Sequence, residues 1–183
     1  MKRLFTNTFE FPVCCCQMKR FLRRVKREAT EADVSLYSMG KSFEGRKMPV
    51  VTLALNPDND DEVKDMLQMF DWFIAPIVNP DGYAYSRAKP ENRLWRKTRS
   101  DKHMNGTGCV GVDANRNFGF DWNPESGASS DPCSPVFAGP APFSEPETRN
   151  IRDWLKKLSD RTALFSDLAR LQSGCADPAW RKS

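Results

Sequence analysis

The chain is 183 residues long, which favours one domain or one domain with tails. Its hydrophobic content of 39% is sufficient for a single core, and its net charge of +4 does not by itself indicate a nucleic-acid-binding protein. No apolar run reaches the roughly 20 residues that a membrane-spanning helix requires. We therefore expect no transmembrane segment and no nucleic-acid partner.

Residues 1–33 are expected to form a basic N-terminal extension. The opening segment, MKRLFTNTFEFPVCCC, resembles a secretion signal only weakly, because Asn7 and Glu10 interrupt its apolar stretch. Cys14, Cys15 and Cys16 are adjacent, so disulfide formation among them is geometrically unfavourable. Palmitoylation, metal binding and no role at all stay open for this cysteine run.

A helix is predicted over residues 17–32 (QMKRFLRRVKREATEA), which contain many helix formers and no Gly or Pro. Phe21, Leu22 and Val25 form a narrow apolar stripe on it. The basic residues from Lys19 to Arg27 are interpreted as a solvated face. Binding of this face to acidic membranes or RNA is a distant alternative.

Three apolar segments have the length and composition of strands. They are KMPVVTLAL (47–55), WFIAPIV (72–78) and CVGVDA (109–114). Between the first two, residues 57–71 predict a short helix with an acidic start, and NPDG (79–82) predicts a turn. Alternation of strands and helices indicates an α/β sheet covered by helices.

A further helix is predicted from FSEPETRNIRDWLKKL. Ser144 and Glu147 have the spacing of a capping box, in which each side chain satisfies a backbone N–H of the other residue. A last helix is expected over residues 160–172, ending near Gly174. The apolar face of the first of these helices consists of Ile151, Trp154, Leu155 and Leu158.

An Asn-Arg-Asn cluster, residues 115–117, follows the third strand candidate. A guanidinium can bind a carboxylate through two parallel charge-assisted hydrogen bonds, and an adjacent amide can add another donor. Each such bond contributes on the order of 1.5–3 kcal/mol. Asn115 and Arg116 are therefore candidates for carboxylate binding, while capping of a helix and pairing with Asp113 or Asp121 are the alternatives.

Four segments, in this order and spacing, resemble the middle of a zinc carboxypeptidase of the carboxypeptidase A/B family. The segment GKSFEGRKMPVVTL (40–53) resembles the start of that catalytic domain. The resemblance implies an incomplete carboxypeptidase-like mixed sheet covered by helices over residues 34–158, followed by an unrelated tail over residues 159–183. The four segments are IVNPDGYAYS (77–86), NRLWRKTRS (92–100), CVGVDANRNFGFDW (109–122) and GASSDPCSPVFAGPAPFSEPE (127–147).

The resemblance also implies roles for individual residues. Asn115 and Arg116 match the pair that holds the terminal carboxylate of a peptide, and Arg93 matches a neighbouring subsite arginine. Arg96 matches the arginine that stabilises the oxyanion of the tetrahedral intermediate. On composition alone, the basic run from Arg93 to Arg99 is more typical of a solvated surface.

Cys109 and Cys133 match the disulfide of the family. The loop that they would close holds about 25 residues, so the bridge would stabilise the fold by about 3 kcal/mol in the chain-entropy model. Two free thiols in a reducing compartment are the alternative. By resemblance the protein is expected to be extracellular.

The zinc site of the family needs two histidines and a glutamate, plus an open position for water. The sequence contains one histidine, His103, and has no His-x-x-Glu motif where the family places it, after Leu55. No metal ligand is therefore assigned, although zinc is the cofactor of the family. By resemblance, the family also has a strand and a helix after the position of Leu55 that this sequence lacks. Their loss would leave apolar strand edges at residues 50–55 and 72–78, so we expect a marginally stable monomer or an aggregation-prone chain.

The resulting functional interpretation is a metallocarboxypeptidase, an exopeptidase that releases C-terminal residues, which is catalytically incomplete in this chain. A non-catalytic binder of peptide or protein C-termini is the alternative. An interaction protein that acts through its basic helix is a distant third.

Overall fold

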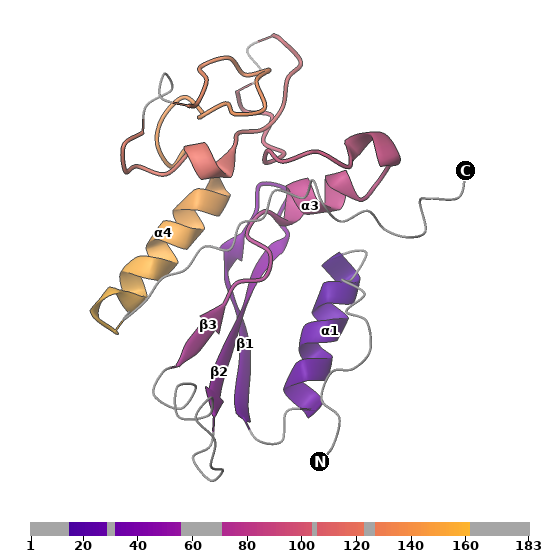
Figure 1. Ribbon diagram of the computed structural model, residues 1–183, viewed down its shortest axis with the longest axis vertical. Helices are drawn as coiled ribbons and strands as arrows, with labels where there is room; N and C mark the ends of the chain where they lie inside the picture. The colour runs from indigo at the N-terminus through magenta and orange to yellow at the C-terminus, as the bar shows by residue number, and fades with distance from the viewer. Residues whose placement is uncertain (1–14, 29–31, 56–70, 104–105, 123–126, 162–183) are drawn as a thin grey trace.

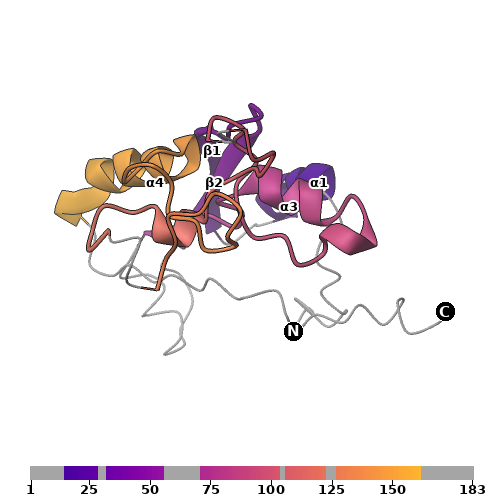
Figure 2. The same cartoon turned by 90° about the horizontal axis from the view of Figure 1, so that it is seen from above.

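The computed structural model describes residues 15–28, 32–55, 71–103, 106–122 and 127–161. A small sheet lies between two helices, α1 (Cys15–Glu28) and α4 (Pro146–Leu158) (Figure 1). The same order of α4, sheet and α1 is visible from above (Figure 2). The sheet and its two helices therefore form three layers, as expected for a sheet covered by helices.

The sheet contains β1 (Ala32–Lys41), β2 (Lys47–Leu55) and β3 (Trp72–Ile74), in the order β1-β2-β3. Both pairs are antiparallel. The predicted strand 47–55 is confirmed with these bounds. The predicted strand 72–78 is shorter than expected and ends at Ile74, two residues before Pro76, which has no N–H to donate to a strand ladder.

The face of the sheet toward α1 carries an apolar core. Leu22 of α1 is buried together with Val34 and Val51, and Phe21 and Val25 of α1 pack against this cluster. These three helical residues are the stripe that the sequence predicts. Burial of such a stripe against a sheet is the main source of stability for an amphipathic helix.

The opposite face packs against α4. Ile151 of α4 is buried, and Trp154 lies edge-on to Phe73 of β3 with ring centroids 6.1 Å apart. Asn150 donates to the carbonyl of Lys41 at 2.8 Å and fits against Gly40, where any Cβ would lie 2.3 Å from the Asn150 side chain. The glycine therefore permits the close approach of α4 to β1.

Two predictions about this helical part are affected by the structure. The capping box is wrong, because Glu145 is the N-cap of α4 and no side chain caps the helix. After α4, residues Ser159–Arg161 form the 3-10 turn η3, and the rest of the expected helix 160–172 lies outside the described residues. The helix expected within residues 57–71 also lies almost wholly outside them.

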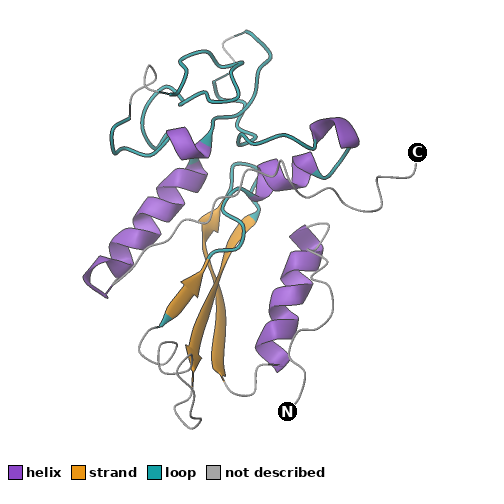
Figure 3. Ribbon diagram, viewed as in Figure 1, coloured by secondary structure: helices purple, strands orange, loops and turns teal. Residues whose placement is uncertain are grey.

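Residues 87–145 are mostly loops, and we call them the loop region (Figure 3). They follow α3 (Pro80–Ser86), which begins where NPDG was expected to form only a turn, because the Asn79 side chain caps it. Short 3-10 turns occur at η1 (Pro90–Asn92) and η2 (Ala114–Arg116). The described helices include none that is long and apolar enough to span a bilayer.

Candidate functional site

The segment after α3 is fixed to that helix through Asn79. Its side-chain oxygen accepts from the N–H of Gly82 at 2.9 Å, and its amide nitrogen donates to the carbonyl of Lys97 at 3.0 Å. The Asn79 side chain thus caps the start of α3 and also binds the basic run from Arg93 to Arg99 through the carbonyl of Lys97. The residues of the predicted turn are therefore part of the framework of the site.

The predicted strand 109–114 is wrong. Residues 98–100 and 111–112 do exchange backbone hydrogen bonds, from Thr98 to Val112 and from Gly111 to Ser100, each 2.8 Å long. Gly111, however, has φ +81°, and a Cβ there would lie 2.0 Å from the carbonyl oxygen of Thr98. This left-handed residue interrupts the extended backbone, and the segment continues into η2.

Asp113 connects Arg96 to η2. One oxygen of its buried carboxylate accepts from the backbone N–H of Asn115 at 3.1 Å, and the other accepts from Nη2 of Arg96 at 2.7 Å. The structure therefore brings Arg96 to the start of the turn that carries Asn115 and Arg116. The alternative in which Asp113 pairs with Arg116 is not the arrangement observed.

Arg116 and Asn115 lie at the surface end of this arrangement. The Nε of Arg116 donates to the carbonyl of Gly127 at 2.9 Å, which fixes the plane of the guanidinium, and Nη1 makes a 3.3 Å bond to the carbonyl of Asn115. Asn115 is exposed. Among the described residues, no hydrogen bond occupies Nη2 of Arg116 or the Asn115 side chain, so both can reach a ligand.

Asn117, the third member of the cluster, has a structural role that the sequence did not reveal. It is fully buried, its amide nitrogen donates to the carbonyls of Ala138 and Ala141, and its oxygen accepts from Thr148 at 2.7 Å and from the N–H of Glu145 at 3.2 Å. The Asn-Arg-Asn cluster therefore divides into two surface residues and one residue that binds the start of α4 to the loop region.

The predicted disulfide between Cys109 and Cys133 is confirmed, with 5.1 Å between the Cα atoms. A second contact supports the same loop, since buried Lys97 donates through Nζ to the carbonyl of Pro132 at 2.7 Å. Burial lowers the pKa of Lys97. The disulfide therefore attaches the loop around Cys133 to Cys109, and Lys97 attaches the same loop to the basic run from Arg93 to Arg99.

Arg93 has a different environment from the other predicted site residues. It follows η1, and its Nη1 atom is buried with no hydrogen-bond partner in the described part of the chain. No hydrogen bond or ion pair joins Arg93 to Arg96, Asn115 or Arg116 within those residues. Hydrogen bonds through Asp113 connect Arg96 to the turn that carries Asn115 and Arg116, and no hydrogen bond between described residues connects Arg93 to this group.

The described residues do not fit a zinc ion. His103 is the one histidine of the sequence, and its Nε2 lies 3.1 Å from Oε1 of the buried Glu145. Cys109 and Cys133 are consumed by their disulfide. No group of three His, Cys, Asp or Glu side chains within the described ranges is placed to hold a metal. A site of two histidines and a glutamate cannot be assembled from these donors.

Buried carboxylates form a further feature that the sequence did not predict. Asp81 accepts from the hydroxyl of Ser42 and from the N–H of Glu44, both at 2.7 Å, and Glu147 accepts from the N–H of Phe43 at 2.9 Å. Both carboxylates therefore hold the turn between β1 and β2. Burial raises the pKa of Glu147 to about 7, and its Oε2 has no hydrogen-bond partner in the described residues.

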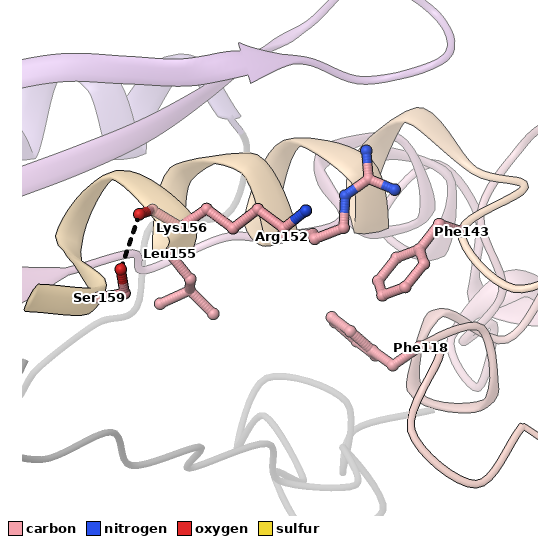
Figure 4. A pocket seen from close by; sticks show the side chains of 6 residues that line it. All are labelled: Phe118, Phe143, Arg152, Leu155, Lys156 and Ser159. Carbon is pink, nitrogen blue, oxygen red and sulfur yellow. Dashed lines mark hydrogen bonds between the residues drawn. The ribbon is translucent and has the colours of Figure 1, made fainter.

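An open hollow of about 360 Å³ lies along the outer side of α4 (Figure 4). Its rim includes the rings of Phe118 and Phe143, with the guanidinium of Arg152 stacked 4.9 Å from the Phe143 centroid. None of the residues predicted to bind a carboxylate lines it. The hollow is therefore distinct from the group around Arg116.

The described residues form an α/β structure in which a small sheet and its helices support a long loop region. The Cys109–Cys133 disulfide stabilises this region, and Arg116 lies at its surface. Residues 53–178 match the zinc carboxypeptidase family. The chain belongs to this family, as the resemblance in its sequence predicts. The expected carboxypeptidase-like fold is also confirmed by the solved structures that resemble it.

Curated relatives have a similar sequence over part of their length. Carboxypeptidase B of Helicoverpa zea is 45% identical over 119 residues, which cover 64% of this chain and 27% of the relative. Carboxypeptidase B of Astacus astacus is 50% identical over 101 residues, or 55% of this chain and 32% of the relative. The chain thus spans about a quarter to a third of these relatives.

Solved structures extend the similarity to most of this chain. Carboxypeptidase A of Helicoverpa armigera has a TM-score of 0.66 at 30% identity, covering 79% of this chain and 42% of that one. Bovine thrombin-activatable fibrinolysis inhibitor, in complex with tick carboxypeptidase inhibitor, has a TM-score of 0.67 at 27% identity, covering 80% and 56%. The shared fold is therefore a portion of a larger carboxypeptidase structure.

Proposed function

We propose that this chain is a metallocarboxypeptidase homologue that does not hydrolyse peptides by itself. The observation that carries this proposal is the donor set. One histidine is present in the 183 residues, and it contacts Glu145 in the loop region. Zinc in a catalytic site is held by three protein ligands with a fourth position for water, which these residues do not provide.

The test is a peptidase assay on the purified chain. Release of C-terminal amino acids from peptides with basic, aromatic and aliphatic ends would be followed with and without a chelator, beside a measurement of bound zinc. We expect no chelator-sensitive release and no stoichiometric zinc. Either signal, if it co-purifies with the chain through successive columns, contradicts the proposal.

A second candidate function is the binding of peptide C-termini, and the geometry of Arg116 favours it. Its guanidinium is held in place by the carbonyl of Gly127, yet Nη2 has no partner among the described residues, and Asn115 beside it is exposed. A carboxylate can accept hydrogen bonds from such a pair. The resemblance to the family supports the same assignment.

We propose a different role for Arg96 from that of Arg116 and Asn115. Its guanidinium is ion-paired with Asp113, so its positive charge is partly compensated before any ligand binds. By resemblance, an arginine here stabilises an oxyanion during hydrolysis. In this chain we assign it a positioning role, because the pair with Asp113 holds the start of η2. Arg93 stays a subsite residue by resemblance alone.

Peptide binding can be tested with matched ligands. Titration calorimetry would compare a peptide that has a free C-terminus with its C-terminal amide, using the wild-type chain and Arg116→Gln. Loss of one charge-assisted interaction should weaken the free peptide by roughly tenfold or more and leave the amide unchanged. Equal affinities for the two peptides would eliminate this candidate without affecting the first proposal.

We also propose that the protein is extracellular. The disulfide between Cys109 and Cys133 supports this location, because structural disulfides form and persist in oxidising compartments. The family resemblance points the same way. Non-reducing peptide mapping of the protein from its native source tests the proposal, and free thiols at both positions would contradict it.

A further inference from the structure

The exposed face of α1 concentrates positive charge in one place. The helix contains six basic residues and one acidic residue, so its formal charge is +5. The rest of the chain then has 22 basic and 23 acidic residues and a formal charge of −1. The whole positive excess of the protein therefore resides on one helix.

The arginines of this helix are arranged in a line. Arg20, Arg23, Arg24 and Arg27 follow the spacing of one helical face, and all four are exposed. They span about 10 Å along the helix axis at the usual rise per residue. We call these four residues the arginine stripe. Such a line of guanidiniums matches an extended ligand with repeated anionic groups better than a single small anion.

Packing fixes the direction of the arginine stripe. Phe21, Leu22 and Val25 face the sheet and pack with Val34 and Val51, on the side of the helix opposite the stripe. The helix forms an outer layer of the molecule (Figures 1 and 2). The guanidiniums are therefore presented to solvent by a helix that the sheet holds in place.

Little of this charge is neutralised within the described structure. Arg24 forms an ion pair with Glu28 at 3.0 Å, and its side chain is still 68% exposed. Arg20, Arg23 and Arg27 form no ion pair with another described residue. Exposed guanidiniums with free donors bind sulfate and phosphate groups in a bidentate manner.

The chemistry of the helix distinguishes among classes of polyanion. Insertion into a bilayer requires a free apolar face, but the apolar face of α1 is buried on the sheet. Binding of single-stranded nucleic acid uses exposed aromatic rings, but Phe21 packs against the core. The disulfide favours an oxidising compartment, where the abundant linear polyanions are sulfated polysaccharides.

We propose that the arginine stripe of α1 is a docking surface for a linear sulfated polysaccharide. This surface lies on α1, whereas Arg116 lies in the loop region, and the proposal does not depend on the proposed peptide binding. Binding of the polysaccharide by the arginine stripe is electrostatic, so the affinity falls as the salt concentration rises.

The test uses the full chain and heparin as the probe. Binding would be measured over a series of salt concentrations for wild type, for Arg20→Gln/Arg23→Gln/Arg27→Gln, and for the control Lys89→Gln/Lys156→Gln/Lys157→Gln. The control removes the same charge from exposed residues elsewhere. We expect the stripe variant to lose roughly tenfold or more in affinity and to show a shallower salt dependence, and the control to change less than about twofold.

Several outcomes would overturn the proposal. Equal losses in the two variants would mean that net charge, and not the stripe, governs binding. Tighter binding at the same salt to phosphatidylserine vesicles or to single-stranded RNA than to heparin would assign the face to another partner.

An Arg20→Lys/Arg23→Lys/Arg27→Lys variant should bind with intermediate affinity, because charge is kept while bidentate contact is lost.

A measurement on the unaltered chain gives an independent answer if a variant folds poorly. Arginine-selective labelling by phenylglyoxal, followed by peptide mapping, reports which guanidiniums heparin covers. We expect protection of Arg20, Arg23 and Arg27 and none of Arg87. The reverse pattern, or uniform protection, would refute the docking surface.

Discussion

The sheet layers and the loop region are stabilised by different kinds of interaction. In the sheet layers, apolar side chains such as Leu22, Val51 and Ile151 are buried between helices and strands. In the loop region, fully buried side chains such as Thr98 and Asn117 are polar, and the Cys109–Cys133 disulfide closes a loop. The residues proposed to bind a peptide end belong to the second kind of structure. A surface arginine can be held in place by specific polar contacts without a surrounding sheet.

This contrast predicts the largest effect at Asn117. Replacing Asn117 by Ala leaves buried partners unsatisfied, among them the hydroxyl of Thr148 and the N–H of Glu145. Each such loss costs about 1–3 kcal/mol, so the variant should lose roughly 3 kcal/mol or more of unfolding free energy. Urea unfolding followed by tryptophan fluorescence measures it.

Asn115 provides the matched control two residues away. It is exposed, so Asn115→Ala should change the unfolding free energy by no more than about 0.5 kcal/mol while weakening binding of free peptide C-termini. A loss for Asn117→Ala as small as that for Asn115→Ala would show that the loop region does not depend on the Asn117 network. The comparison between polar and apolar regions would then fail.

The second prediction concerns the pH dependence of stability and the contact of Glu147 with the turn between β1 and β2. Glu147 sits in α4 and accepts from the N–H of Phe43, and burial raises its pKa to about 7 from an ordinary 4.5, with the carboxylates of Glu145 and Asp81 adding to the effect. The folded state therefore holds this proton more tightly than the unfolded state. The resulting stabilisation is complete below about pH 4.5 and is lost as pH rises through about 7.

The size of this effect is on the order of 3 kcal/mol for such a shift. Unfolding free energies measured from pH 4.5 to 8 should show a decline that Glu147→Gln largely removes, because the amide keeps the acceptor and cannot ionise. Glu91→Gln, at an exposed position, should leave the decline intact. A wild-type profile that is flat over this range contradicts the assignment.

Local patterns in the sequence were sufficient for β2 and for the apolar stripe of α1, whereas β1 was not predicted. The β-branched run of 47–55 and the stripe of Phe21, Leu22 and Val25 specify their structures because burial follows a simple period. The disulfide pairing and the role of Arg96 came from resemblance to a family, whereas Asn115 and Arg116 were already candidates from guanidinium and amide chemistry. No periodicity in the loop region could have supplied them.

The failures have a common physical cause in long-range contacts. Glu147 has the spacing of a capping box but accepts from Phe43, 104 residues away in the chain. The segment 109–114 has the composition of a strand, but Gly111 adopts a left-handed conformation against Thr98. The inward orientation of Asn117, unlike its neighbour Asn115, depends on partners from residues 138–148. Such partners cannot be read from adjacent residues.

The smallest predicted effect on stability concerns β3, one of the two edge strands of the described sheet. β3 pairs with β2 on one side and has no described strand on the other, and Ile74 on this edge is 44% exposed. Exposed apolar edge strands favour association between chains, and a lysine on such an edge opposes it. Ile74→Lys should therefore reduce light scattering on heating while changing the unfolding free energy by only about 0.5 kcal/mol.

A charge-matched control separates the edge from net charge. Ser130→Lys adds the same charge at an exposed polar position in the loop region, away from both edges of the sheet. We expect this variant to scatter as much light as wild type in static light scattering at equal concentration. If it suppresses scattering as strongly as Ile74→Lys, solubility depends on total charge. In that case the open β3 edge is not what drives association, and the sheet layers are less vulnerable than their exposed edge indicates.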